Sequence, residues 1–458
     1  MRGYAFSSVK ESMQQTASEL GPAMPPPNKN GQAASAATTT PAVLPPWVRA
    51  QALNVTRHAA ALRPFRRDEF GNGPPAPTDS HIDTVNGLIG KLRSGLLKVT
   101  RRVGAAAEGA IRRPATAALQ HVVDLKTKAH RWVQGIEKIW DFYFELFGQR
   151  QSPPYGTWLL CCDRIALDCY QVAYMGIGTA KSIPAPPPFS YMRTGFSPAT
   201  FRRGIPLTRL GKQINPFPLI QLPYHRLVNP WTLGAVLHEV SHNLQSDLGL
   251  GRVVPRNIAL RLLRHQCGRM VALIWTRWNR ELFADLSALL LGGPAVVGSL
   301  FDIVGRDVET VLTYSPHGVH PTPYLRALLS IELLRRMGFT KEADQYRRLW
   351  HRIYPNPRSG TMPPRLLNTF ADACGLVVDT VCYQPFAELG NKKLSEVIRF
   401  AGKEQTMVEE AARRLAAGND PGIIPERFLI GATRVAVDQR LARPGVITAN
   451  FYKELARR

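Results

Sequence analysis

The hydrophobic pattern changes character along the chain. Residues 1–80 are rich in Pro, Ala and Arg, and they show no sustained apolar period. Within them, residues 21–46 carry too few apolar side chains to offset the entropy lost on ordering. From residue 82, apolar residues recur at helical spacing. The pattern predicts a largely disordered region over 1–80 and a basic helical region over 81–150.

The rest of the chain alternates apolar helical segments with breaks. We expect helices over 156–180, 256–278, 323–337, 341–353, 361–400 and 403–417. A short strand is predicted over 218–222, and the Pro-rich stretch before it, 182–218, is typical of a functional loop beside a cleft. The fold class is therefore α+β and predominantly helical, with a main domain over 151–400 and a helical C-terminal cap over 401–458.

Residues 238–242 read His-Glu-Val-Ser-His. Two histidines four residues apart project from one face of a helix, so both can bind one metal ion. Glu239 then lies where it can take a proton from a metal-bound water. Asn229-Pro230 and Gly249 are typical start and stop signals for that helix. The motif predicts a Zn²⁺ site with His238 and His242 as ligands and Glu239 as catalytic base.

A third ligand must come from elsewhere in the chain. The extended motif His-Glu-x-x-His-x-x-Gly-x-x-His is excluded, because Gln245 and Leu248 stand at its last two positions. Downstream, Glu281 and Asp285 are again four residues apart, among Leu and Phe side chains. The alternative to a ligand role is an amphipathic helix with two solvated acids.

The two motifs together resemble those of the gluzincin metallopeptidases, whose second motif is Glu-x-x-x-Asp on a helix packed against the first. The resemblance covers residues 215–340. It implies a zincin-like catalytic domain in which Glu281 completes the ligands of one Zn²⁺ ion. It also implies that Asp285 accepts the spare N–H of His238 or His242. The strand at 218–222 would be an edge strand that binds extended substrate by β-addition.

A third stretch, residues 317–326, is similar to a His-Pro segment ending in Arg that some gluzincins carry. The resemblance implies that His320 or Tyr324 donates a hydrogen bond to a developing oxyanion. Arg326 would pair with Asp285 or with the substrate. The alternative is that the histidines of this stretch, His317 and His320, are ordinary loop residues.

The chain has 58 basic and 34 acidic residues, a formal net charge of +24. Such an excess of base favours contact with polyanions such as nucleic acid or anionic lipid. Basic residues crowd the 81–150 region, which we expect to pack as a helical hairpin with its basic face in water, or else to bind a polyanion. The six cysteines lack Cys-x-x-Cys spacing, which disfavours a zinc ribbon or a redox motif.

Targeting signals are not evident in the sequence. Residues 1–20 have no apolar core segment of the kind that a signal peptide carries. The most apolar stretch, 288–304, is interrupted by Gly292-Gly293-Pro294 and by Asp302, so we expect buried core rather than a membrane span. We therefore expect a cytoplasmic protein without a transmembrane segment.

These observations lead to one functional prediction and two alternatives. The prediction is a zinc metallopeptidase that hydrolyses a protein or peptide substrate, with Glu239 activating the water. One alternative is a nucleic-acid- or membrane-associated protease anchored by the basic N-terminal region. The other is a catalytically inactive zinc-binding scaffold, which the presence of Glu239 disfavours.

Overall fold

The structure, a computed structural model, describes residues 41–178 and 181–458. The chain divides at Val48, and Val48–Arg458 forms one compact unit. Helix α2 (Leu44–Ala61) begins just before Val48, and all the elements that follow lie in this unit. The described residues are predominantly helical with a few short strands, which confirms the predicted α+β class.

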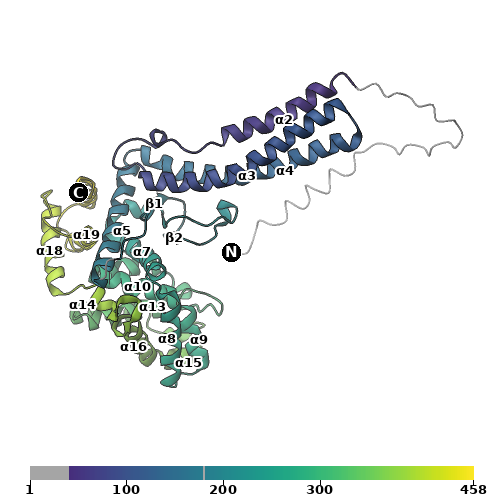
Figure 1. The fold of residues 1–458 in the computed structure, drawn as a ribbon. Coiled ribbons are helices and arrows are strands. Elements are labelled where there is room, and N and C mark those ends of the chain that lie inside the picture. The colour runs from purple at the N-terminus through teal and green to yellow at the C-terminus, as the bar shows by residue number, and fades with distance from the viewer. Residues whose placement is uncertain (1–40, 179–180) are drawn as a thin grey trace. The chain divides into compact units, whose positions relative to one another are not determined.

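Long helices form the N-terminal part of this unit. α3 (Asp79–Arg112) and α4 (Thr116–Gly148) run antiparallel beside α2 (Figure 1). The turn between α3 and α4 contains Pro114, which lacks the N–H that a continuous helix would need. At Gly95 a Cβ would lie 2.8 Å from the indole ring of Trp132, so the small residue lets the two helices approach closely. The helical region predicted from residue 82 is confirmed.

The prediction of a largely disordered region over 1–80 is wrong for residues 44–80. Helix α2 buries Val55 and Ala59, and the segment after it buries Phe65 and Phe70 against α3 and α4. The apolar positions of α2 form one narrow stripe, which is stable only against the surface that the later helices supply. Local composition therefore did not reveal the helix. Residues 1–40 of the predicted region lie outside the described residues.

The sheet that borders the helical body has three strands, β1 (Phe189–Met192), β2 (Ala199–Phe201) and β3 (Leu219–Leu222). Their order is β1-β3-β2, with β1 parallel and β2 antiparallel to β3. The strand predicted over 218–222 is confirmed, but the expectation that it is an edge strand is wrong. Both edge strands, β1 and β2, lie in the stretch 182–218 that is expected to be a loop. They are too short to produce a recognisable hydrophobic period in a Pro-rich segment.

Helices α5 (Tyr155–Ile177) and α7 (Gly234–Asp247) pack together, and α7 packs closely on α10 (Asn279–Gly292). Helix α7 is shorter than predicted, since Asn229-Pro230 starts a separate 3₁₀ turn, after the short helix α6 (Tyr224–Leu227). The single helix predicted over 256–278 is also wrong. The chain forms α8 (Leu250–Arg264) and α9 (Arg269–Arg277), separated by positive φ angles at Gln266 and Gly268.

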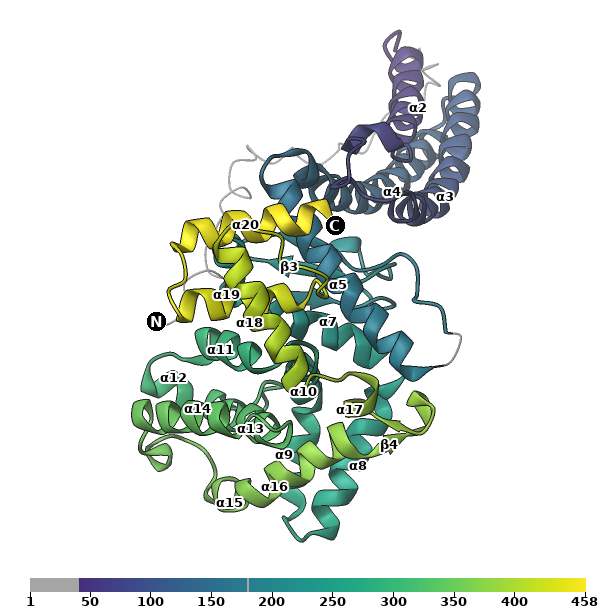
Figure 2. The same ribbon diagram turned by 90° about the vertical axis from the view of Figure 1, so that its left-hand side faces the viewer.

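The remaining helices share one core with α5, α7 and α10. The predictions over 323–337, 341–353 and 403–417 are confirmed by α13, α14 and α18, whereas the predicted helix over 361–400 is interrupted by a short hairpin. In Figure 2, α18, α19 and α20 lie together. The bounds are α11 (Pro294–Val304), α12 (Val308–Leu312), α13 (Pro323–Arg336), α14 (Thr340–Ile353), α15 (Pro364–Asn368), α16 (Phe370–Val378), β4 (Pro385–Phe386), β5 (Lys392–Lys393), α17 (Leu394–Val397), α18 (Gly402–Ala416), α19 (Phe428–Asp438) and α20 (Pro444–Arg457).

Among the described residues, none of the helices combines the length and the apolar character needed to cross a bilayer. Helix α11 is apolar, but it is 11 residues long and buries most of its side chains in the core. The stretch over 288–304 is thus buried core, as its Gly and Pro residues indicate.

A buried ion pair joins the C-terminal helices to the core. Arg427, at the start of α19, donates from Nη1 to Asp168 Oδ1 at 2.8 Å and from Nε to the Leu291 carbonyl at 3.1 Å. Its backbone N–H donates to Asp168 Oδ2 at 3.0 Å, and both residues are buried. One carboxylate of α5 thus accepts two hydrogen bonds from Arg427 and balances its charge.

We expect Asp168→Ala to lower the free energy of unfolding by roughly 3–5 kcal/mol, because it leaves the Arg427 charge buried without a partner. Urea unfolding followed by circular dichroism measures the change. Glu410→Ala is the control, since that acid pairs with Arg413 and Arg414 on the exposed face of α18. Equal unfolding midpoints for the two variants would contradict the structural role of the buried pair.

Candidate metal centre

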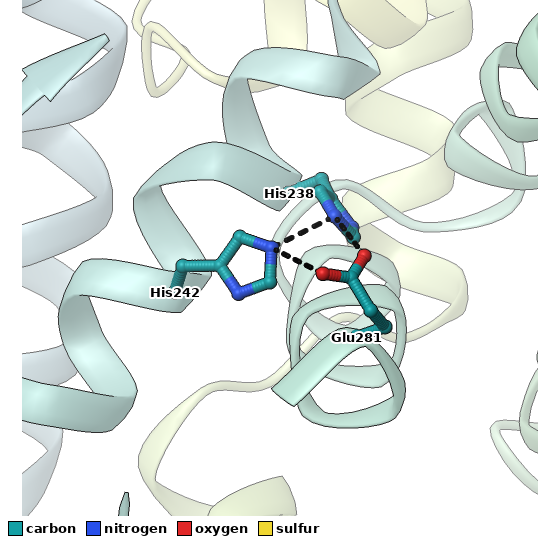
Figure 3. Close-up of side chains that lie close together, drawn as sticks. All are labelled: His238, His242 and Glu281. Atoms are coloured by element: carbon teal, nitrogen blue, oxygen red, sulfur yellow. Dashed lines mark hydrogen bonds and ion pairs between the residues drawn. The ribbon is translucent and has the colours of Figure 1, made fainter. Parts of the chain in front are cut away.

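The side chains of the two motifs meet between α7 and α10. His238 and His242 lie one turn apart on α7, and Glu281 reaches them from the first turn of α10 (Figure 3). At Gly292 a Cβ would stand 2.6 Å from the Leu237 side chain. The small residue therefore keeps α10 close to α7, so that a carboxylate on one helix reaches two imidazoles on the other.

The donor atoms of the three residues have the spacing of metal ligands. The Nε2 atoms of His238 and His242 are 3.1 Å apart. Glu281 oxygens lie 3.4 Å from His238 Nε2 and 3.5 Å from His242 Nε2. Ligands at about 2.0–2.1 Å from a tetrahedral ion such as Zn²⁺ stand about 3.3 Å from one another. His238, His242 and Glu281 could therefore hold a metal ion with little rearrangement.

Asp285 fixes the orientation of the first histidine. Its Oδ1 atom lies 2.9 Å from His238 Nδ1, which leaves His238 Nε2 facing His242 and Glu281. Arg326, from α13, holds the same carboxylate with two guanidinium nitrogens, and its Nη2 lies 2.8 Å from Oδ1. Of the two partners implied for Arg326, the structure pairs it with Asp285. A buried acid with two cationic or donating partners is a strong orienting group.

The ionisation of the group follows from its burial and its charges. Burial opposes charge on His238, but Asp285 and Glu281 outweigh it and raise the pKa of His238 to about 10. Burial and the charge of His238 lower the pKa of His242 to about 3. Burial also opposes ionisation of Glu281 and Asp285, but His238 and Arg326 lower the pKa of both acids. In the metal-free protein one proton therefore resides on His238, between two carboxylates.

Glu239 borders the three ligand residues and lines the same cleft. It is buried, and burial raises the pKa of Glu239 to about 7. A carboxyl group with a pKa close to neutrality can both accept and return a proton at neutral pH. Its position and its proton affinity suit the role of base that the motif predicts.

His320 and Tyr324 have different surroundings. His320 Nε2 lies 3.4 Å from Glu281 Oε1, and the side chain remains largely exposed in the cleft. The structure does not bring the Tyr324 hydroxyl to the three ligand residues, since it lies 3.1 Å from His351 Nδ1. The reason is helical phase. Residues two apart on a helix point about 200° apart, so α13 cannot direct both Tyr324 and Arg326 at His238, His242 and Glu281, the metal group.

Two positioning residues were missed in the sequence. Asn243 donates from Nδ2 to the Thr200 hydroxyl at 2.8 Å and to the Glu239 carbonyl at 3.0 Å. The first bond joins edge strand β2 to α7 one residue beyond His242. An Asn in the middle of an apolar helix was a signal that could have been followed. Its partner Thr200 cannot be predicted from the sequence, because Thr200 lies in β2, a strand that the local pattern does not indicate.

Two cavities meet at the metal group and share His238, Glu239, Glu281 and His320. One runs between α7, α10 and α11, and its apolar lining includes Ala288, Leu289, Val296, Val297, Leu300 and Ile303. The other follows β2 and is lined by arginines, Arg202, Arg277 and Arg280. A molecule that crosses the metal group therefore meets an apolar side and a cationic side.

Comparison with known proteins assigns no family: no family model, curated protein or solved structure matches the chain.

We expect Glu281→Ala to weaken Zn²⁺ binding more than Asp285→Asn does. The first change removes a donor atom, whereas loss of an outer hydrogen-bond partner costs roughly 10- to 100-fold in affinity. Tyr324→Phe is the control, since its hydroxyl contacts His351 instead of the metal group. Competition with a zinc chelator measures all three affinities. Wild-type affinity in Glu281→Ala would refute the ligand set.

Metal affinity should also rise with pH. A metal ion binds neutral imidazole, and the raised pKa of His238, about 10, keeps that ring protonated near neutrality. Binding near pH 7 should thus release close to one proton from His238, and affinity should fall as the pH is lowered. Calorimetry in two buffers of different ionisation enthalpy counts the protons. Asp285→Asn should release fewer, and a wild-type count of zero would contradict the charge distribution.

Proposed function

We propose that the protein is a zinc metallopeptidase of the gluzincin type that hydrolyses peptide bonds. The observation that carries the proposal is the set of three donor residues, His238, His242 and Glu281, whose ligand atoms lie within 4.8 Å of one another, beside Glu239 in an open cleft. Structural zinc sites are closed by four protein ligands, whereas catalytic sites use three and leave one position open. Among the described residues, the group that could hold a metal is this set of three.

The metal identity follows from the ligands. Two imidazoles and one carboxylate form a borderline donor set that suits Zn²⁺, and such a set with an open position is typical of zinc hydrolases. Bound zinc would acidify a water molecule and polarise the carbonyl of the scissile bond.

The residues of the chain have separate roles in the proposed reaction. Glu239 takes the proton of the attacking water and passes it to the leaving amine. His320 lies on the open side of Glu281, where its Nε2 can donate a hydrogen bond to the oxygen that gains charge. Asp285 and Arg326 hold His238 in the orientation that binding needs. The β2 edge beside α7 offers backbone groups to which an extended peptide can add.

The two alternatives are weaker. Burial of Glu239 without an ion-pair partner lowers the stability of the fold. An inactive zinc scaffold would gain no function that offsets this cost. A peptidase anchored to a polyanion by its N-terminal helices is compatible with the same site. Support for it comes from exposed basic residues on α3 and α4, including Lys91, Arg101, Arg102, Lys128 and Arg131.

The test is Glu239→Gln, which keeps the size of the side chain and removes its basicity. We expect hydrolysis of an unfolded protein substrate to fall by roughly 10²- to 10⁴-fold, the usual contribution of a general base. Zinc content, measured by atomic emission, should stay at the wild-type level. Glu388→Gln serves as a control on an acid outside the cleft residues. Full activity in purified Glu239→Gln protein would overturn the mechanism.

A further inference from the structure

The cleft on the β2 side of the metal group is cationic. Arg202 directly follows β2, Arg277 is the last residue of α9, and Arg280 directly precedes Glu281. All three line the cavity that contains His238, His242 and Glu239. Between Asp247 and Glu281 the sequence has no acidic residue, so all the charged residues of the segment that joins the two metal motifs are basic.

Arg277 has a structural partner. Its guanidinium donates to the Pro316 carbonyl in the loop that carries His320. This bond ties the loop between α12 and α13 to the end of α9. Arg277 thus lines the cleft, but its guanidinium is already hydrogen-bonded within the protein.

Arg202 and Arg280 differ from Arg277. In the described part of the chain, neither guanidinium forms an ion pair or a hydrogen bond with the protein. Both residues line the same cavity, and burial and the charge of Arg280 lower the pKa of Arg202. Asp247 acts on Arg202 through its charge, but its carboxylate accepts a hydrogen bond from Tyr170 at 2.8 Å.

Several buried or half-buried arginines of this unit pair with carboxylates. Arg326 holds Asp285, Arg427 holds Asp168, and Arg434 lies 2.6 Å from Asp302. Two unpaired arginines that line one cavity repel each other, and an anionic ligand bound there relieves the repulsion. Guanidinium groups suit carboxylates because they donate two parallel hydrogen bonds.

The edge strand brings a peptide to these cations. A peptide added to β2 runs along Ala199–Phe201 and so passes Arg202, the next residue. From there it reaches the metal group, which the same cavity contains, and then the apolar cavity on the other side. The two sides of the scissile bond would therefore meet different chemistry.

We propose that Arg202 and Arg280 bind a carboxylate of the peptide substrate, so that the cleft selects peptides with an acidic group close to the scissile bond on one side. This inference rests on the proposed peptidase function and names its substrate class. The carboxylate can come from an Asp or Glu side chain, or from the C-terminus of the peptide. In both cases the two guanidinium groups would replace mutual repulsion with charge-assisted hydrogen bonds.

The experiment uses zinc-loaded, full-length protein and quenched fluorescent peptides, whose ends are blocked except where a free carboxylate is stated. One peptide series places Glu, Gln or Lys at successive positions on both sides of the cleaved bond. A second series contains no acidic residue and ends in either a free carboxylate or an amide. We expect kcat/KM to be roughly 10- to 100-fold higher for Glu than for Gln at one position, the range for a hydrogen-bonded charge.

The variants identify the groups responsible. Arg202→Gln and Arg280→Gln should each reduce the Glu/Gln ratio, and Arg202→Lys should retain part of it. Arg202→Glu should favour the Lys peptide, a reversal that a loss of folding cannot produce. Arg264→Gln is the matched control, because it removes one charge from the same basic segment outside both cavities. An equal reduction in Arg264→Gln would show a general field and overturn the assignment.

The outcomes separate this inference from the proposed function. Equal cleavage of Glu and Gln peptides, with no preference for a free C-terminus, overturns the carboxylate site and leaves the peptidase intact. A preference confined to the free C-terminus supports the site with a terminal carboxylate as its ligand. If no peptide is cleaved, the proposed function fails. Fluorescence anisotropy with zinc-loaded Glu239→Gln protein then tests the site alone, and equal affinity for Glu and Gln peptides overturns it.

Discussion

The buried carboxylate of Asp285 is the group on which the rest of the site depends. It lies within hydrogen-bond distance of His238 and of two nitrogens of Arg326. Taking such a charge out of water costs several kcal/mol unless partners satisfy it. Arg326 supplies the opposite charge, and His238 receives its orientation in return. α7, α10 and α13 are therefore joined by polar contacts at the point where their apolar faces meet.

The same contact explains the geometry further out. Because Arg326 must face Asp285, the start of α13 has a fixed rotation, which turns Tyr324 toward His351 and away from the cleft. The loop before α13 then passes the open side of Glu281, and Arg277 holds it there through the Pro316 carbonyl. The place of His320 beside Glu281 is thus set by two arginines, one at each end of its loop.

How far the sequence predicts this site depends on the range of each interaction. His238, Glu239 and His242 share one helical turn, so their spacing alone brings them together. Glu281 and Asp285 lie on another helix, and their place was inferred through resemblance to a family. β2 and the Thr200–Asn243 bond depend on pairing between distant segments. No local pattern carries such pairing.

The expectations that the structure does not meet have the same origin. The α2 helix is stable only against α3 and α4, so a composition-based reading of residues 44–80 could not find it. The chemistry of Tyr324 suits an oxyanion donor, but the rotation that Arg326 imposes on α13 turns its hydroxyl toward His351. In both cases the environment of the residue is set by contacts with a distant part of the chain, α3 and α4 for helix α2 and Asp285 for α13.

The distribution of charge links the site to its proposed substrates. The chain carries a net charge of +24, yet Glu239, Glu281 and Asp285 are gathered at one point between α7 and α10. Glu281 and Asp285 contact the two histidines and Arg326, whose positive charge offsets theirs within the site. A bound divalent cation would neutralise more of the acidic charge. Under the proposed function, a peptide that approaches the cleft meets the field of Arg202 and Arg280, which attracts an acidic side chain.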